Sequence, residues 1–215
     1  MNKKSQKISS KAKEWTAIGI IVLVLTLLII ANKIFRQKAA TPNNSNPGNL
    51  PGIQTGDAPW SAGLTHLRER LDQIGLRPLT QEGTALHIHQ HLDIFIDDKP
   101  VAIPAGIGID QGAGFIADIH THDGTGIIHV ESPVRKTFYL GQFFDIWGVD
   151  FTSGRIGGYK NQGDKSLKVF VNGSLYSGDP RQIALENHQE IVITYGTNQE
   201  LPGSIPSKYN FPVGY

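Results

Sequence analysis

The amino-acid sequence predicts a mainly β domain of the α+β class, with an antiparallel, sandwich-like sheet and one or two short helices, preceded by a single transmembrane helix. Three observations lead to this class. An uncharged apolar run lies near the N-terminus, apolar and polar residues alternate after residue 84, and turn-forming pairs such as Asn172-Gly173 separate the alternating runs. With 39% apolar residues among 215, the chain can bury one core of ordinary size. One globular domain with appendages is therefore expected.

The apolar run from Trp15 to Asn32 is long enough to cross a bilayer. As a helix its eighteen residues reach about 27 Å, close to the roughly 30 Å of the hydrocarbon core. Residues 1–38 hold eight Lys or Arg and one acidic residue, and the basic residues before the run favour a cytoplasmic N-terminus. We therefore expect a basic cytoplasmic head over 1–14, a single-pass anchor in the cell membrane over 15–36, and an extracytoplasmic domain.

The alternatives to an anchor are a cleaved secretory signal and a helix buried in the core. A cut after Ala31 would put the bulky Ile29 where a signal peptidase needs a small residue. The chain has no cysteine, which excludes disulfides, thiolate metal ligands and a lipid-modified cysteine. Residues 39–215 carry twelve basic and eighteen acidic residues, so no nucleic acid is expected as a partner. The lipid bilayer is the one partner that the sequence indicates, and it names no protein partner.

Residues 37–60 are rich in Pro, Asn and Gly and are expected to form a flexible stalk. The β-rich domain then covers 61–200, and residues 201–215 form an irregular, exposed tail. The domain begins with a short amphipathic helix, which has Ser61 as its N-cap and Gly75 just past its end. Its apolar residues recur at helical spacing: Leu64, Leu67, Leu71 and Ile74.

After Thr84 the apolar period changes from that of a helix to that of a strand. Strands are predicted at 86–96, 101–104, 115–122, 127–131, 168–171, 183–185 and 190–195. A second helix is predicted within residues 139–148, where Gly148 can end it. Its bulky residues would fill the core: Phe143, Phe144, Ile146 and Trp147.

Six of the eight histidines fall within one stretch of 43 residues, far more than an even spread would place there. On the predicted strand 86–96, the residues His87, His89, His91 and Asp93 share one face, and mostly apolar residues share the other. The apolar face must turn to the core, because burying unpaired imidazoles costs free energy. The histidine face is therefore expected to be free for chemistry.

A hairpin with its turn at residues 124–125 would bring the next three histidines together. In that register His120 lies directly opposite His129, and His122 lies opposite Ile127. Opposite Cβ atoms are about 4.5 to 5.5 Å apart, so these three imidazoles can converge on one ion. Three histidines with an open position suit zinc, and imidazole also suits copper.

The histidines of the first strand cannot all reach that ion unless the strand bends, so two of them would join the hairpin site or form a second one. The candidate metal ligands are His87, His89, His91, His120, His122 and His129. Four carboxylates have positions from which they can orient these rings or ligate directly: Asp93, Asp118, Asp123 and Glu131. A copper or zinc ion is the expected cofactor. No nucleotide cofactor is expected, because the Gly-rich stretch 104–114 lacks the ending of a P-loop.

Four segments together resemble a known family. They are the histidine strand 86–96 and the stretches "HTHDGTGIIHVESP", "LGQFFDIWGV" and "NHQEIVITYG". The family consists of uncharacterised, often membrane-anchored or secreted bacterial and archaeal proteins that share an (L/I)HTHDxTGIIHxE core and an LGxFFxxWGV segment. The resemblance covers residues 86–196, about half of the chain. It implies no reaction, points to the same histidines and to Asp123, and leaves His91 as the least secure ligand.

Three functions remain open at the level of sequence. The first is a membrane-anchored extracytoplasmic protein that binds copper or zinc through the histidine cluster. The second is a zinc-dependent hydrolase or hydratase, in which His120, His122 and His129 hold the ion and Glu131 or Asp93 moves the proton. The third is a surface interaction module without metal, in which the histidines form hydrogen bonds or respond to pH.

Overall fold

The computed structural model describes residues 47–215. The expected head, the expected anchor and the first part of the expected stalk, up to residue 46, lie outside the described residues. Within residues 47–215, no helix combines the length and the apolar character that crossing a bilayer requires.

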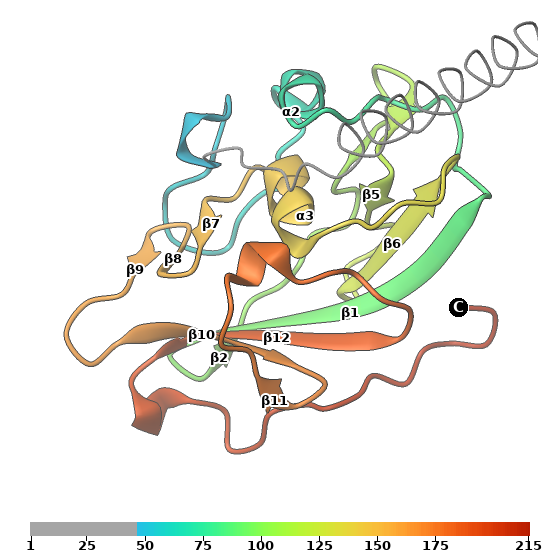
Figure 1. Cartoon of the computed structure of the whole chain (residues 1–215). Helices are drawn as coiled ribbons and strands as arrows, with labels where there is room; N and C mark the ends of the chain where they lie inside the picture. Colours follow the sequence, from blue (N-terminus) through green and yellow to red (C-terminus); the bar gives the residue numbers. More distant parts are fainter. Residues whose placement is uncertain (1–46) are drawn as a thin grey trace, which may run out of the picture. The chain divides into compact units, whose positions relative to one another are not determined.

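One mixed sheet organises the described part of the chain (Figure 1). Its strands are β1 (Leu86–Ile96), β2 (Lys99–Pro100), β5 (Ile119–His120), β6 (Ile127–Ser132), β10 (Ser166–Val171), β11 (Ser174–Leu175) and β12 (Gln189–Gly196). The order across the sheet is β11, β10, β12, β1, β6, β5, and β2 pairs with the end of β1. β1 and β12 are parallel, whereas all the other pairs are antiparallel. The prediction of a purely antiparallel sheet is therefore wrong.

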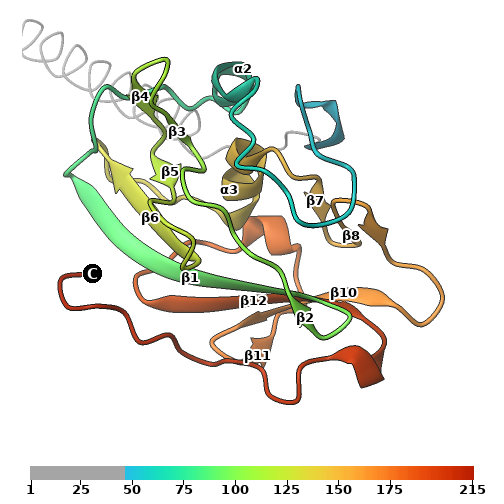
Figure 2. The same ribbon diagram turned by 180° about the vertical axis from the view of Figure 1, so that it is seen from behind.

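The parallel pair is possible because a long connection separates its two strands. That connection contains the helix α3 (Leu140–Trp147), and the helix α2 (Leu67–Gln73) precedes β1. Both helices lie on one side of the sheet, and the C-terminal segment runs along the other side (Figures 1 and 2). The sheet is thus covered by helices on one face and by irregular chain on the other.

The remaining elements are short. They are β3 (Ile109–Asp110), β4 (Phe115–Ile116), β7 (Phe151–Thr152), β8 (Arg155–Ile156), β9 (Tyr159–Lys160) and the 3-10 turns η1 (Pro47–Asn49), η2 (Pro180–Gln182) and η3 (Asn198–Glu200). β3 pairs with β4, and β7 to β9 form a three-stranded sheet. Since these small sheets are only two residues long in each strand, the fold is β-rich α+β but not a sandwich of two equal sheets.

The predicted helix at 139–148 is confirmed as α3. All eight of its residues are buried, and its aromatic side chains form the centre of the core. Burying one large apolar side chain contributes about 1.5 to 3 kcal/mol, which outweighs the modest helix propensity of phenylalanine and tryptophan. Gly148 ends the helix in the left-handed conformation, with φ of 75°.

The first helix is shorter than predicted. α2 begins at Leu67, although Gly75 does follow its end with φ of 71°. Ser61 is not its N-cap. The main-chain nitrogen of Ser61 donates to Gln54 Oε1 at 2.9 Å, and its carbonyl accepts a hydrogen bond from Trp147 Nε1 at 2.7 Å. These contacts, one to Gln54 and one to Trp147 of α3, hold residue 61 outside the helix.

Residues 47–60 belong to the folded domain, which corrects their assignment to the stalk. Leu50 and Trp60 are buried in the core. The main-chain nitrogen of Gln54 donates to the carbonyl of Gly148 at 2.7 Å, and the rings of Trp60 and Trp147 meet edge to face at 5.8 Å. Composition suggested a stalk, but these few apolar side chains suffice to bind the segment to α3.

The predicted strand 86–96 matches the bounds of β1. The predicted strand 115–122 is interrupted, because the main-chain nitrogen of Ala117 donates to Gly108 instead of to a sheet neighbour. No strand forms at 101–104, and residues 183–185 contribute a single bridge through Ala184. Short apolar runs pack into the core here without joining the sheet.

Candidate metal centre

Histidines form one row across three neighbouring strands, on the face of the sheet that turns away from α3. His89 of β1 pairs with His129 of β6, and His129 pairs with His120 of β5. In the next row, His87 of β1 pairs with Glu131 of β6. The prediction that His120 lies directly opposite His129 is therefore confirmed.

The ladder of this hairpin ends sooner than predicted. β5 stops at His120, so His122 does not pair with Ile127. The turn between β5 and β6 begins near Asp123, whose Oδ1 accepts a hydrogen bond from the main-chain nitrogen of Thr125 at 2.9 Å. Freed from the ladder, His122 places its Nε2 3.2 Å from His120 Nε2.

Two pairs of histidines have the spacing of ligands on a common ion. In the His87 pair (His87 and His89) the two Nε2 atoms are 3.2 Å apart. In the His120 pair (His120 and His122) they are also 3.2 Å apart. Two nitrogens that each lie about 2.0 to 2.1 Å from a tetrahedral zinc ion are about 3.3 Å from one another. Each pair thus matches one edge of a coordination tetrahedron.

His129 and Glu131 lie between the two pairs. Oε1 of Glu131 is 3.2 Å from His87 Nε2 and 3.1 Å from His129 Nδ1. Oε2 of Glu131 is 4.0 Å from His120 Nε2, is buried and has no hydrogen-bond partner.

We call these six residues the histidine cluster: His87, His89, His120, His122, His129 and Glu131. They form two overlapping groups that share His129 and Glu131, and the ligand atoms of each group lie within 4.8 Å of one another. In these positions one or more metal ions can be held by imidazole nitrogens and a carboxylate.

Burial sets the protonation of the cluster. Desolvation lowers the pKa of His89 to about 4, helped by the neighbouring charges of His129 and His87. Desolvation also lowers the pKa of His120 to about 4. For Glu131, burial alone would raise the pKa, but the hydrogen bond from His129 and the nearby histidine charges outweigh it and bring the pKa to about 2. At neutral pH, the imidazoles of His89 and His120 are therefore neutral and Glu131 is ionised, which is the state in which such groups bind metal.

His91 stands apart from the histidine cluster, although it lies on the same face of β1. Its Nδ1 is 3.0 Å from Glu190 Oε2, and its Nε2 is 2.9 Å from the carbonyl of Thr125. Burial lowers the pKa of His91, but the hydrogen bond to Glu190 and the charge of that carboxylate outweigh it and raise the pKa overall. When Glu190 is ionised, two acceptors require two N–H donors and this imidazole is cationic, although burial raises the pKa of Glu190 as well.

A third group of ligand atoms within 4.8 Å consists of His91, Asp93 and Glu190. Both nitrogens of His91 are already engaged there by hydrogen bonds, which leaves no lone pair for a metal. The buried pair of His91 and Glu190 is therefore better described as an ion pair that joins β1 to β12.

Of the four carboxylates in the prediction, Glu131 alone lies in the histidine cluster. Asp93 approaches His91 at 4.0 Å. Asp118 is buried, which raises the pKa of its carboxyl, and its carbonyl accepts a hydrogen bond from the main-chain nitrogen of Glu131 at 2.8 Å. Asp123 shapes the turn. Asp118 and Asp123 thus support the backbone next to the ligands.

The histidine face is more covered than predicted, because the tail 201–215 runs along it. The ring of Tyr215 lies 4.7 Å from that of His89 and 5.5 Å from that of His129. The main-chain oxygen of Tyr215 accepts a hydrogen bond from His188 Nε2 at 2.9 Å. Tyr215 is nevertheless 37% exposed, so the expected exposure of the tail is confirmed at this residue, although its ring packs on the histidines.

The same tail covers His91, on which Tyr209 stacks with ring centroids 3.8 Å apart. Only 4% of His89 and 5% of His91 remain exposed. The outer member of each pair stays open, since the side chains of His87 and His122 are 53% and 40% exposed. The expected free face thus exists at the edge of the cluster but not at its centre.

Four residues that contact the histidines were missed in the sequence: Glu82, Glu190, Tyr209 and Tyr215. Glu82 Oε1 lies 3.5 Å from His122 Nε2. None of these residues has a histidine beside it in the sequence except Glu190, two residues after His188. The alternation of Tyr209 and Phe211 is the only local signal that the tail presents one face to a surface.

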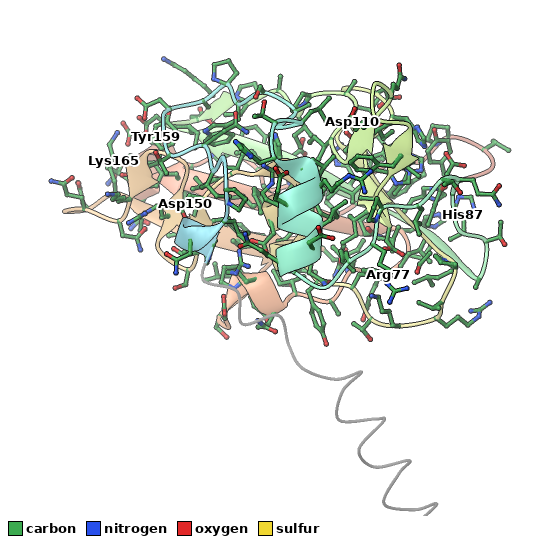
Figure 3. The ribbon with its side chains drawn as sticks, turned by 90° about the horizontal axis from the view of Figure 1, so that it is seen from above. Arg77, His87, Asp110, Asp150, Tyr159 and Lys165 are labelled. Atoms are coloured by element: carbon green, nitrogen blue, oxygen red, sulfur yellow. The ribbon has the colours of Figure 1, made fainter. Side chains whose placement is uncertain are left out.

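A cavity of about 440 Å³ lies elsewhere, between Pro59, Lys99 and Tyr159. Figure 3 shows Tyr159 and Lys165 at the opposite end of the domain from His87. The histidine cluster is therefore a site on a sheet face and is separate from this cavity.

Comparisons of the chain with protein-family models, with curated proteins and with solved structures give no match. No reaction or ligand can be taken from a relative.

Proposed function

We propose that the protein binds a transition-metal ion, zinc or copper, through the histidine cluster. The observation that carries this proposal is the buried carboxylate of Glu131 among five imidazoles, with one oxygen that has no hydrogen-bond partner. A buried, ionised oxygen without a partner costs free energy unless a cation or a donor satisfies it. A metal ion held by the neighbouring imidazoles supplies that charge.

A network of hydrogen bonds alone explains the cluster less well. In each histidine pair the two Nε2 atoms face one another. If both rings are neutral, one Nε2–H donates to the other Nε2, and that N–H is then not available to Glu131. Such a network leaves Oε2 of Glu131 unsatisfied. The contrast with His91, whose two nitrogens both meet good acceptors, shows what a satisfied histidine looks like on this sheet.

The ligand types narrow the choice of metal. The chain has no cysteine, and its single methionine is residue 1, so the soft sulfur ligands that select Cu(I) are missing. Imidazole and carboxylate suit Zn(II) and Cu(II). We therefore propose one of these two ions.

We also propose that the protein is anchored in the cell membrane by residues 15–36, with the domain outside. The support is the apolar run and the basic residues before it. Metal handling at the cell surface is the role that follows. In cell fractionation the intact chain should sediment with membranes and resist extraction by high salt. Recovery in the soluble fraction at full length would contradict the anchor.

The test of metal binding is elemental analysis of the full chain, purified without a polyhistidine tag and dialysed against zinc or copper at neutral pH. We expect retained metal, and its release as the pH falls below about 6, because protonated imidazole does not coordinate. His129→Ala should abolish or strongly reduce retention, since both groups share this residue. His66→Ala is the matched control, because His66 pairs with Glu69 on α2, outside the cluster. Failure of the wild-type chain to retain either metal would refute the proposal.

A further inference from the structure

The histidine cluster offers more ligands than one ion uses. It presents five imidazoles and one carboxylate, in two groups of four that overlap at His129 and Glu131. A zinc site normally takes four ligands in total. A single ion would therefore leave one histidine pair unused, at a cost in buried polar surface.

The two oxygens of Glu131 approach different pairs. Oε1 is 3.2 Å from His87 Nε2, whereas Oε2 is 4.0 Å from His120 Nε2. Since Oε2 has no hydrogen-bond partner, it is free to act as a ligand on the side of the His120 pair. Two-metal sites hold their ions about 3.5 to 4 Å apart, a separation that the two oxygens of one carboxylate can bridge.

From this arrangement we propose that the histidine cluster is a dinuclear centre, in which the carboxylate of Glu131 bridges two divalent transition-metal ions. The His87 pair holds one ion and the His120 pair holds the other. This inference rests on the proposed metal binding and adds its stoichiometry and its bridge.

The two proposed metal positions differ in whether His129 is one of their ligands. Its ring centroid is 4.6 Å from that of His89 and 4.5 Å from that of His122, so it lies midway between the pairs. As a neutral imidazole it gives one lone pair and can complete the ligand set of one ion only. The other ion then has two imidazoles and one carboxylate oxygen from the protein, and its remaining position is open to an exogenous ligand.

The experiment measures how many ions the metal-free full chain binds, without a polyhistidine tag, by equilibrium dialysis and elemental analysis with zinc and, separately, with copper. We expect two ions per chain. His87→Ala and His122→Ala should each bind one. Both replaced side chains are largely exposed, at 53% and 40%, so these variants should fold.

Two controls exclude other sources of a second ion. Asp93→Asn alters the third group, and His66→Ala removes a histidine outside all three groups. Both variants should still bind two ions. Loss of an ion in either control would place the second ion away from Glu131 and overturn the proposal.

Electron paramagnetic resonance of the copper-loaded chain tests the bridge. Two Cu(II) ions that share a carboxylate are exchange-coupled, so the signal per copper should fall well below that of an isolated ion. His87→Ala and His122→Ala should restore the full signal of one uncoupled ion. A wild-type chain that holds two uncoupled ions would overturn the bridge. Binding of a single ion would overturn the dinuclear centre and leave metal binding intact, whereas no binding at all would refute both proposals.

Discussion

His89 and His91 differ by two positions on the same face of β1, yet their surroundings make them chemically opposite. Both are buried, with 4% and 5% of their surface exposed. The pKa of His89 is lowered to about 4 by desolvation and by neighbouring imidazoles, whereas the pKa of His91 is raised because Glu190 outweighs its burial. One ring is neutral and can give a lone pair, and the other is a cation in an ion pair.

The alternation of side chains along a strand thus determines which face of the sheet a residue lies on, but not which groups it contacts there. Across the sheet, His89 meets another imidazole, His129, on β6, whereas His91 meets the carboxylate Glu190 on β12. His91 lies opposite Ile127 on β6, and His89 lies just before Gln90, where the pairing with β12 begins, so a shift of two residues changes the neighbours on both sides.

The largest expected effect comes from breaking the ion pair. His91→Ala would leave Glu190 buried without a counter-charge, and this should cost about 3 to 5 kcal/mol of the free energy of unfolding. Urea denaturation of the metal-free chain measures it. The double variant His91→Ala with Glu190→Gln should recover much of the loss, because no charge then remains buried. A loss below about 1 kcal/mol in the single variant would mean that His91 is not part of an ion pair.

Removing a ligand of the cluster should affect metal affinity more than stability. His122→Ala should weaken zinc binding at its position by about 100-fold or more, equivalent to about 2.7 kcal/mol. Its effect on the metal-free chain should be small, because the side chain is 40% exposed. Competition with a zinc chelator measures the affinity. His91→Gln should change it less than tenfold, and equal losses in both variants would contradict the separation of the two sites.

The two kinds of histidine should give opposite pH dependence of stability in the metal-free chain. The pKa values of His89 and His120 fall from the ordinary 6.5 to about 4, so between these values the unfolded chain binds more protons and stability decreases as the pH falls. The raised pKa of His91 acts the other way, since its stabilisation is complete below 6.5 and is lost as the pH rises through the folded-state value.

Unfolding free energies of wild type, His89→Gln and His91→Gln between pH 4 and pH 8 measure these slopes. His89→Gln should flatten the loss on the acidic side, whereas His91→Gln should remove the loss of stability that accompanies the rise of the pH above 6.5. Identical slopes in the two variants would show that the two rings do not differ in protonation.

The smallest effect should come from the tail that covers both rings. Tyr215→Ala removes a ring packed on His89 and His129, a contact worth about 0.5 to 1.5 kcal/mol. We expect dissociation of bound zinc into excess chelator to become up to about tenfold faster, with unchanged stoichiometry. Val213→Ala, at a fully exposed residue of the same tail, is the control. An unchanged dissociation rate would mean that Tyr215 does not limit access to the cluster.

The features that depend on local periodicity are predictable from the order of the amino acids alone. Alternation over residues 86–96 set the bounds of β1 and the common face of its histidines. The register around the turn predicted that His120 lies opposite His129. The bulky run ending at Gly148 predicted α3. In each case the residues that decide the structure are neighbours along the chain, so the pattern contains the physical cause.

The groups that contact the histidines depend instead on the assembled fold. The parallel pairing of β12 with β1 brings Glu190 to His91, and the tail returns to cover His89 with Tyr215. Glu131, one carboxylate among four in the prediction, lies between the two histidine pairs because β6 pairs with β1 on one side and with β5 on the other. These contacts join residues far apart in the chain and depend on the summed burial of the whole core. No local pattern encodes them, because their free energy arises only once the strands are assembled.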